Sequence, residues 1–122
     1  MTHDDVATFK ELTTNFIKAP AISLGLTADT GSAQGGQPLV SSFNEIAVCA
    51  NAGDAVTLPA SFEKGTIVFI KNTGGASCDV FPASGDDCGA GANTAVALAA
   101  GDGIAYIATA ANATWTNFII GT

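Results

Sequence analysis

The run Thr66-Ile67-Val68-Phe69-Ile70-Lys71-Asn72, closed by Thr73-Gly74-Gly75, decides the fold class of this sequence. Its β-branched and aromatic side chains favour a strand, and the glycines that follow supply a turn. Because positions 67–70 are all apolar, both faces of this strand are expected to be covered. Either the strand lies centrally in a sandwich with one or two apolar side chains facing outward, or its outer face packs on an identical neighbour in a closed oligomer.

Short runs of the same kind lie on both sides of this stretch and are separated by residues that favour turns. The sequence predicts strands at residues 39–50, 55–58, 66–72, 77–81, 94–98, 103–109 and 113–120. Strands at this spacing are typical of all-β sandwiches and barrels. We therefore predict a mainly β protein, in which residues 39–122 form a compact antiparallel β-sandwich or a jelly-roll-like barrel.

Residues 1–38 differ from this body and are expected to form an N-terminal arm. Apolar residues recur at near-helical spacing in the first part, which favours a short amphipathic helix that Ala19-Pro20 would end. The stripe consists of Val6, Phe9, Leu12, Phe16 and Ile17. Residues 25–38 are rich in glycine and lack apolar periodicity, so they are expected to form a linker or an extended arm.

The charge balance argues against several classes of function. The 122 residues include eleven Asp and Glu against four Lys and no Arg, which gives a formal charge of −7. Because arginine is absent and acid is in excess, a nucleic-acid partner is not expected. The N-terminus carries Asp4 and Asp5 and no apolar run of secretory length. The sequence therefore predicts neither a signal peptide nor a membrane span, and no membrane partner.

Side chains that commonly carry out catalysis are few. His3 is the single histidine, so the body lacks the histidine pairs used in nucleophilic and acid–base catalysis. Carboxylates do gather around two predicted turns, at Asp79, Asp86, Asp87 and Asp102. Aspartate favours turns for backbone reasons, so we interpret these residues as solvated turn positions. A calcium site and the catalytic pair of a small glycosidase are the alternatives. We predict no catalytic residue, no cofactor and no metal site.

The cysteines and the two largest aromatic residues have structural interpretations. Cys49, Cys78 and Cys88 cannot all pair within one chain. A bridge between Cys78 and Cys88 would close the turn between them, but buried reduced thiols are the favoured interpretation. Tyr106 and Trp115 are interpreted as packing residues rather than as ligand platforms.

A series of segments in the body carries a family resemblance. They are Val56-Thr-Leu-Pro-Ala60, Gly65-Thr-Ile-Val-Phe-Ile-Lys-Asn72, Val80-Phe-Pro-Ala-Ser-Gly-Asp86, Asn93 to Ala100, and Trp115. In this order they resemble a strand-and-turn module of tailed-bacteriophage virion proteins, and the resemblance covers about residues 39–122. In that family the module occurs in capsid decoration or cement proteins and in head or tail fibres, commonly as trimers.

The resemblance implies a structural virion protein that decorates and stabilises a bacteriophage capsid. Such a protein is made in the host cytoplasm and binds the outer capsid surface as a homotrimer, with the major capsid protein as its partner. We expect Val6, Phe9, Leu12, Phe16 and Ile17 to contact the capsid or a neighbouring trimer, unless the arm folds back on its own body. The alternative is a receptor- or carbohydrate-binding module of a phage head or tail fibre. The short chain without coiled-coil heptads favours decoration over a fibre.

Overall fold

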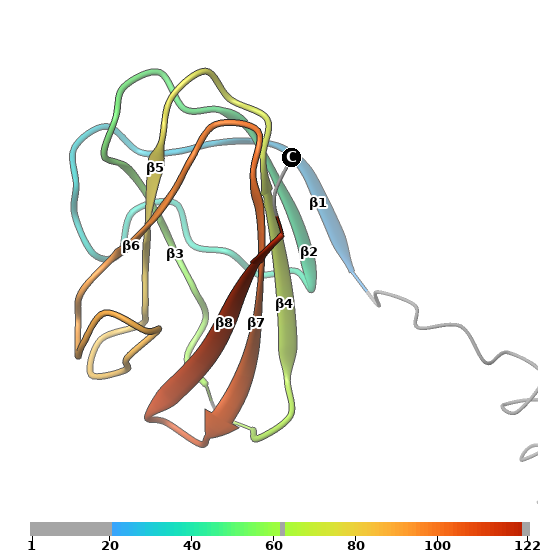
Figure 1. Cartoon of the computed structure of the whole chain (residues 1–122), viewed down its shortest axis with the longest axis vertical. Helices are drawn as coiled ribbons and strands as arrows, with labels where there is room; N and C mark the ends of the chain where they lie inside the picture. Colours follow the sequence, from blue (N-terminus) through green and yellow to red (C-terminus); the bar gives the residue numbers. More distant parts are fainter. Residues whose placement is uncertain (1–20, 62, 121–122) are drawn as a thin grey trace, which may run out of the picture.

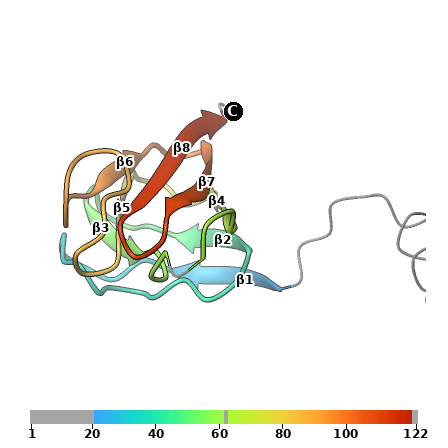
Figure 2. The same ribbon diagram turned by 90° about the horizontal axis from the view of Figure 1, so that it is seen from below.

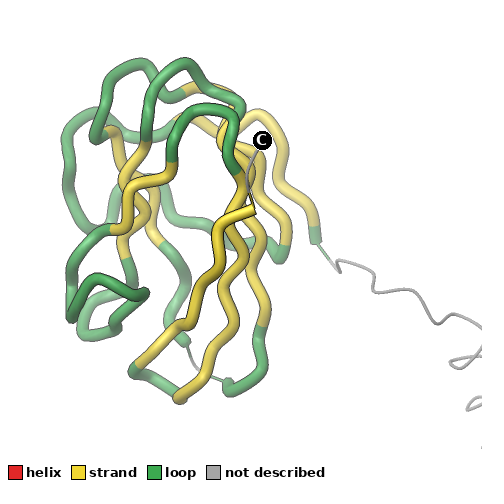
Figure 3. Tube along the Cα trace, in the orientation of Figure 1, coloured by secondary structure: helices red, strands yellow, loops and turns green. Residues whose placement is uncertain are grey.

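Strands make up all the regular secondary structure of the described residues, 21–61 and 63–120, in this computed structural model (Figure 1). The strands are β1 (Ile22–Thr27), β2 (Phe43–Val48), β3 (Asp54–Thr57), β4 (Ile67–Asn72), β5 (Cys78–Phe81), β6 (Val96–Leu98), β7 (Gly103–Ala110) and β8 (Thr114–Ile120). No helix occurs in this part of the chain, so the protein is mainly β, as the sequence predicts (Figure 3). The predicted N-terminal helix falls on residues 1–20, which lie outside the described residues.

The strands form two sheets with one core between them. A five-stranded sheet has the order β1-β2-β4-β7-β8, and a three-stranded sheet has the order β3-β5-β6. Figures 1 and 2 show the two sheets on opposite sides of the body. A single buried cluster draws Ile46, Val68 and Tyr106 from the larger sheet and Val56 and Val80 from the smaller one. The inner faces of both sheets therefore supply the hydrophobic core.

Both sheets are mixed, so the predicted antiparallel arrangement is wrong. The pairs β1–β2, β2–β4 and β3–β5 are parallel, whereas β4–β7, β5–β6 and β7–β8 are antiparallel. The path of the chain explains the parallel pairs β2–β4 and β3–β5, because it changes sheet between β2 and β3, between β3 and β4, and between β4 and β5. Two such crossings return the chain to its first sheet running in its first direction, which makes the flanking strands parallel.

Residues 25–38, which the sequence predicts as a linker or an extended arm, are hydrogen-bonded to the body in the structure. The start of this segment forms the end of β1, which pairs with β2. Beyond β1, the backbone of Asp29 exchanges hydrogen bonds with Ala55 at 2.9 and 2.8 Å, and the carbonyl of Gln37 accepts one from the amide of Thr57 at 3.1 Å. Backbone groups make these contacts, so the segment needs no apolar periodicity to be held in place.

The turn after β4 follows the sequence prediction and depends on one glycine. Asn72 ends β4 as a buried residue, and its Nδ2 donates to the carbonyl of Leu98 at 3.0 Å. Its Oδ1 accepts a hydrogen bond from the amide of Gly74 at 3.0 Å. A Cβ added to Gly74 would lie 2.6 Å from the backbone nitrogen of Cys49, which is inside van der Waals contact. The close approach of the two loops therefore requires glycine at position 74.

Candidate interaction surface

The central strands of the five-stranded sheet carry apolar side chains on both faces. Val68 and Ile70 of β4 belong to the buried core. Strand residues alternate between faces, so Ile67 and Phe69 point outward. Phe43 of β2 is the register partner of Phe69 and shares its face. Within the described residues only the inner face is covered by the second sheet, which leaves the outer face as an apolar surface.

This outer surface is most exposed at β1 and in the loop before β2. Ile22 pairs with Phe43 and is 61% exposed, Leu24 is 65% exposed and Val40 is 82% exposed. The register of β1 shifts between Ser23 and Leu26, where Gly25 has a φ of +72°, so Leu26 packs on the core while Leu24 stays outside. We call the surface made by the following residues the apolar face: Ile22, Leu24, Val40, Phe43, Ile67 and Phe69.

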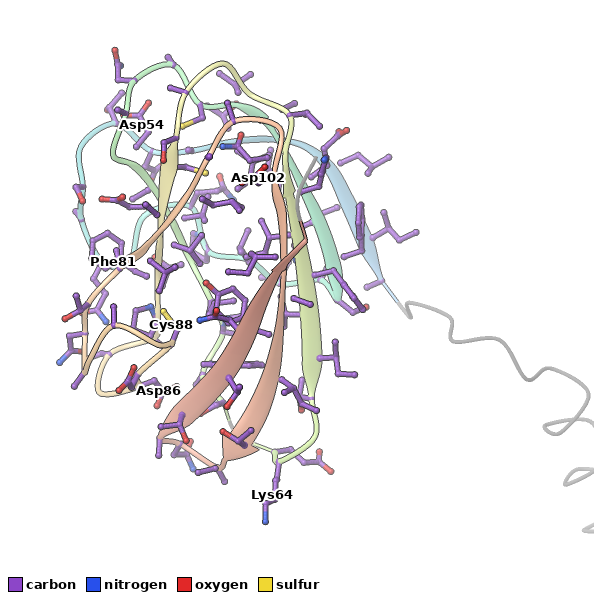
Figure 4. All side chains as sticks on the ribbon, viewed as in Figure 1. Asp54, Lys64, Phe81, Asp86, Cys88 and Asp102 are labelled. Atoms are coloured by element: carbon purple, nitrogen blue, oxygen red, sulfur yellow. The ribbon has the colours of Figure 1, made fainter. Side chains whose placement is uncertain are left out.

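The apolar face has no net formal charge. Glu45 of β2 and Lys71 of β4 are register partners and are the charged residues at outward positions of β1, β2 and β4. Residues 21–122 contain eight acidic residues and two lysines, a formal charge of −6, so the other charges are almost all negative. Figure 4 places Asp54 and Asp102 at the upper end of the body. The apolar face is thus neutral in a body that is otherwise mostly acidic.

A shallow hollow of about 200 Å³ borders the apolar face where the chain enters β1. It is lined by Ala21, Val40, Ser41, Ser42, Pro59, Thr66, Ile67 and Val68. Most of this lining is apolar, and its polar side chains are hydroxyls. The hollow can therefore receive an apolar side chain, but its lining offers no charged group for catalysis or for binding an ion.

Asp86 is a buried structural residue, so its interpretation as a solvated turn position is wrong. It is 3% exposed, and its Oδ2 accepts hydrogen bonds from the backbone nitrogen and the hydroxyl of Ser61, at 3.0 and 3.1 Å. The same hydroxyl accepts a hydrogen bond from the amide of Ala113 at 3.1 Å. Asp86 thereby ties the loop after β5 to the segment between β3 and β4.

The other three aspartates of the predicted cluster have separate partners. Asp79 accepts a hydrogen bond from the hydroxyl of Ser32, and Oδ1 of Asp87 accepts one from the amide of Gly89 at 2.7 Å. The backbone carbonyl of Asp102 accepts a hydrogen bond from the backbone amide of Asn72 at 2.9 Å. In the part of the chain that the structure describes, no group of three or more His, Cys, Asp or Glu side chains could hold a metal ion. Asp79 lies in β5, so its interpretation as a turn position is wrong, whereas Asp87 and Asp102 lie between strands. These separate positions and partners do not form a shared ligand site.

The three cysteines are free and buried, in agreement with the favoured interpretation, and the alternative bridge between Cys78 and Cys88 is not formed. Burial raises the pKa of Cys78 to about 12 and the pKa of Cys88 to about 11, and it also raises the pKa of Cys49. Because the thiolate is the reactive form, these pKa values do not favour a nucleophilic cysteine.

Tyr106 and Trp115 pack in the core, as predicted. Their ring centroids lie 6.4 Å apart with an interplanar angle of 80°, an edge-to-face contact. Both side chains are buried, so neither presents a ring to a ligand at the surface. Burial also raises the pKa of Tyr106 above its usual value.

The residues predicted to contact a partner, Val6, Phe9, Leu12, Phe16 and Ile17, fall outside the described residues. The described chain starts at Ala21, which lines the hollow, so the N-terminal segment joins the body beside the apolar face. The apolar face cannot be recognised from the sequence, because Ile22 and Leu24 lie in the segment that is predicted to form the arm. The one sequence feature that points to it is the run of four apolar residues at positions 67–70, which predicts that both faces of that strand are covered.

Comparisons with protein-family models, curated proteins and solved structures gave no match to this chain. Among residues 21–61 and 63–120, no helix has the length and apolar character needed to span a membrane.

Proposed function

We propose that this protein is a bacteriophage capsid decoration protein, a structural virion protein that stabilises the shell by binding its outer surface as a homotrimer. The observation that carries the proposal is an exposed apolar face beside the point where the N-terminal segment joins the body. Exposed apolar patches on small proteins mark protein–protein contacts. The resemblance of residues 39–122 to phage virion modules supports a capsid as the larger partner.

The arrangement of the strands supports a β-sandwich as the finer description of the fold. Two sheets flank one core, and the inner faces of both contribute to it. In this proposal residues 1–20 are the arm of the sandwich, and Val6, Phe9, Leu12, Phe16 and Ile17 contact the major capsid protein. Neither a cofactor nor a nucleic acid takes part. The protein is made in the host cytoplasm and acts on the outer capsid surface.

The work of such a protein is mechanical. Apolar surface buried across the boundary between two capsid subunits stabilises the shell by about 25 cal/mol per Å², before the cost of association is subtracted. A single apolar segment would bind weakly. A trimer that presents three segments gains effective concentration at its second and third contacts, so it stays attached although each contact alone is weak.

The proposal is tested by co-sedimentation of the full chain with empty expanded shells of the phage that encodes it, prepared without the decoration protein. We expect saturation at a fixed number of chains per capsid subunit, and a higher disruption temperature for saturated shells. Wild-type protein that shows no saturable binding would overturn the proposal. Binding of the isolated chain to immobilised glycans, without binding to shells, would favour a fibre module instead.

Variants of the full chain then test the contact residues. Replacing Phe9 and Phe16 by serine is expected to weaken binding to shells about tenfold or more, because two apolar anchors are lost. The matched control replaces Thr8 and Asn15, the polar neighbours of these residues, by alanine and is expected to bind as wild type. Equal binding by both variants would remove the N-terminal stripe from the contact.

A further inference from the structure

We infer that the apolar face is a self-association surface, and that a second copy of this chain covers it. This inference deepens the proposed function, because it names the surface through which copies of the chain meet. It rests on the proposed function only for the number of copies in the oligomer. Its starting point is that Ile22, Leu24 and Val40 are all more than half exposed. Ile22 and Leu24 lie on the outer side of β1, and Val40 lines the hollow together with Ile67. Side chains of this kind lose their contact with water when an identical face packs on them.

The distribution of charge favours this face as the place where two identical acidic chains meet. Two bodies that each carry a formal charge of −6 repel one another over most of their surface. The apolar face is the exception, because Glu45 and Lys71 are opposite in sign and adjacent in register. A basic partner would instead be attracted to the acidic loops. Identical acidic chains therefore meet at the least electrostatic cost through this face.

The form of β1 favours contact through side chains over extension of the sheet at its edge. β1 is an edge strand, and edge strands can pair with another chain. However, the register shift between Ser23 and Leu26 interrupts its ladder, and a bulge of this kind is a common protection against edge pairing. The face itself offers complementary shapes, since Ile22 and Leu24 project from it and the hollow beside Val40 and Ile67 is concave.

The size of the apolar face sets the expected strength of association. Strands lie about 4.8 Å apart and rise about 3.3 Å per residue, so the three six-residue strands β1, β2 and β4 make a surface of roughly 15 by 20 Å. Stable interfaces bury about 800 Å² on each partner, which is more than twice that planar area. Association through this face is therefore expected to depend on protein concentration within the micromolar range, so the test needs a concentration series.

The experiment is sedimentation velocity of the full chain across low micromolar to submillimolar concentrations. Wild type is expected to shift from monomer to a defined oligomer as concentration rises. A variant carrying Leu24→Glu and Val40→Glu is expected to raise the dissociation constant about tenfold or more, because it places like charges in the contact. The matched control is Val48→Glu. Val48 ends β2 and is 46% exposed, but it lies on the same side of the sheet as buried Ile46 and therefore outside the apolar face. It is expected to associate as wild type.

Two further measurements keep the result interpretable. If the glutamate variant loses the fluorescence of buried Trp115, Leu24→Ser and Val40→Ser replace it with a smaller change. The dependence of association on salt provides a second readout. Added salt screens the repulsion between two acidic bodies and is expected to strengthen self-association, whereas it would weaken binding to a basic partner.

The outcomes separate this inference from the proposed function. Wild type that stays monomeric at every concentration would overturn the inference, and so would equal loss of association in the control and the face variant. A monomer whose folding stability drops in the face variant would show that the N-terminal segment of the same chain covers the face. Binding to shells is measured independently, so its failure would remove the decoration proposal and leave the self-association surface in place. A dimer would support the surface and contradict the trimer.

Discussion

Phe43 and Phe69 stand at paired register positions on the parallel strands β2 and β4, and both lie on the outward side of the five-stranded sheet. Their sequence neighbours Asn44 and Val68 are buried on the other side. One pair of strands thus supplies the core with one set of side chains and a contact surface with the other.

Gly74→Ala is expected to destabilise the protein, because the new Cβ would lie 2.6 Å from the backbone nitrogen of Cys49. Overpacking of this kind lowers the free energy of unfolding by about 1–3 kcal/mol. The matched control is Gly75→Ala, where an added Cβ meets nothing within 4 Å. Urea unfolding followed by the fluorescence of Trp115 measures both variants. Equal stabilities for the two would contradict the close approach of the loops.

Asp86→Ala is expected to lower the free energy of unfolding by about 1–3 kcal/mol, because a buried backbone donor of Ser61 loses its acceptor. Asp86→Asn keeps an acceptor oxygen and should lose less. Ser84→Ala, at an exposed position in the same loop, is the control and should change stability little. Chemical denaturation of the three variants gives the comparison. An Asp86→Ala protein as stable as wild type would show that the carboxylate does not hold this loop.

Tyr106→Phe is expected to leave stability unchanged or to raise it by up to about 1 kcal/mol. The hydroxyl of Tyr106 is buried near the Cys88 thiol and has no hydrogen-bond partner among the described residues. Its removal therefore deletes a polar group that was desolvated without compensation. Tyr106→Ala empties the same site and should cost about 3–5 kcal/mol. A clear loss on Tyr106→Phe in thermal unfolding would reveal a hydrogen bond to this hydroxyl.

Stability is expected to fall in alkaline solution. The thiols of Cys78 and Cys88 have a usual pKa of 9.0, which burial raises to about 12 and about 11 in the folded protein. Between these values the folded state binds more protons than the unfolded state, so the contribution of the thiols is complete below pH 9 and is lost as pH rises toward 11–12.

Unfolding midpoints in urea, measured from neutral pH upward, test this dependence. Cys78→Ala removes one of the titrating groups and should give a flatter decline above pH 9 than wild type. Thiol-specific labelling provides a second readout, since folded protein should react much more slowly than protein in denaturant. Rapid labelling of all three thiols in the folded protein would contradict their burial.

The strands from Phe43 onward could be predicted from the sequence, because their β-branched and aromatic side chains favour strands and turn residues separate them. The apolar run at positions 67–70 lies in β4, and the predicted glycine turn follows Asn72. Patterning did not reveal β1, because Gly25 breaks its alternation and its partners are backbone groups of β2. Sequence distance conceals such pairing, so an edge strand whose alternation is broken by a glycine resembles a linker.

The relative direction of the strands and the structural role of Asp86 could not be predicted from the sequence either. Alternation of apolar residues is the same in parallel and antiparallel strands, and the path of the chain between two strands decides their relative direction. Asp86 occupies a Gly-Asp sequence typical of a surface turn, and its burial depends on Ser61, which lies 25 residues earlier in the chain. The apolar face likewise needs β1 beside β2 before its members become neighbours.

The molar mass of the purified full chain in solution, measured by light scattering over a range of concentrations, decides whether copies of the chain associate through the apolar face. We expect the mass to rise from 12.1 kDa to a fixed multiple of it, three times larger for the proposed trimer, and to return toward 12.1 kDa in the variant that carries Leu24→Glu and Val40→Glu. A mass of 12.1 kDa at every concentration would show that the chain does not self-associate and would overturn both the surface and the trimer.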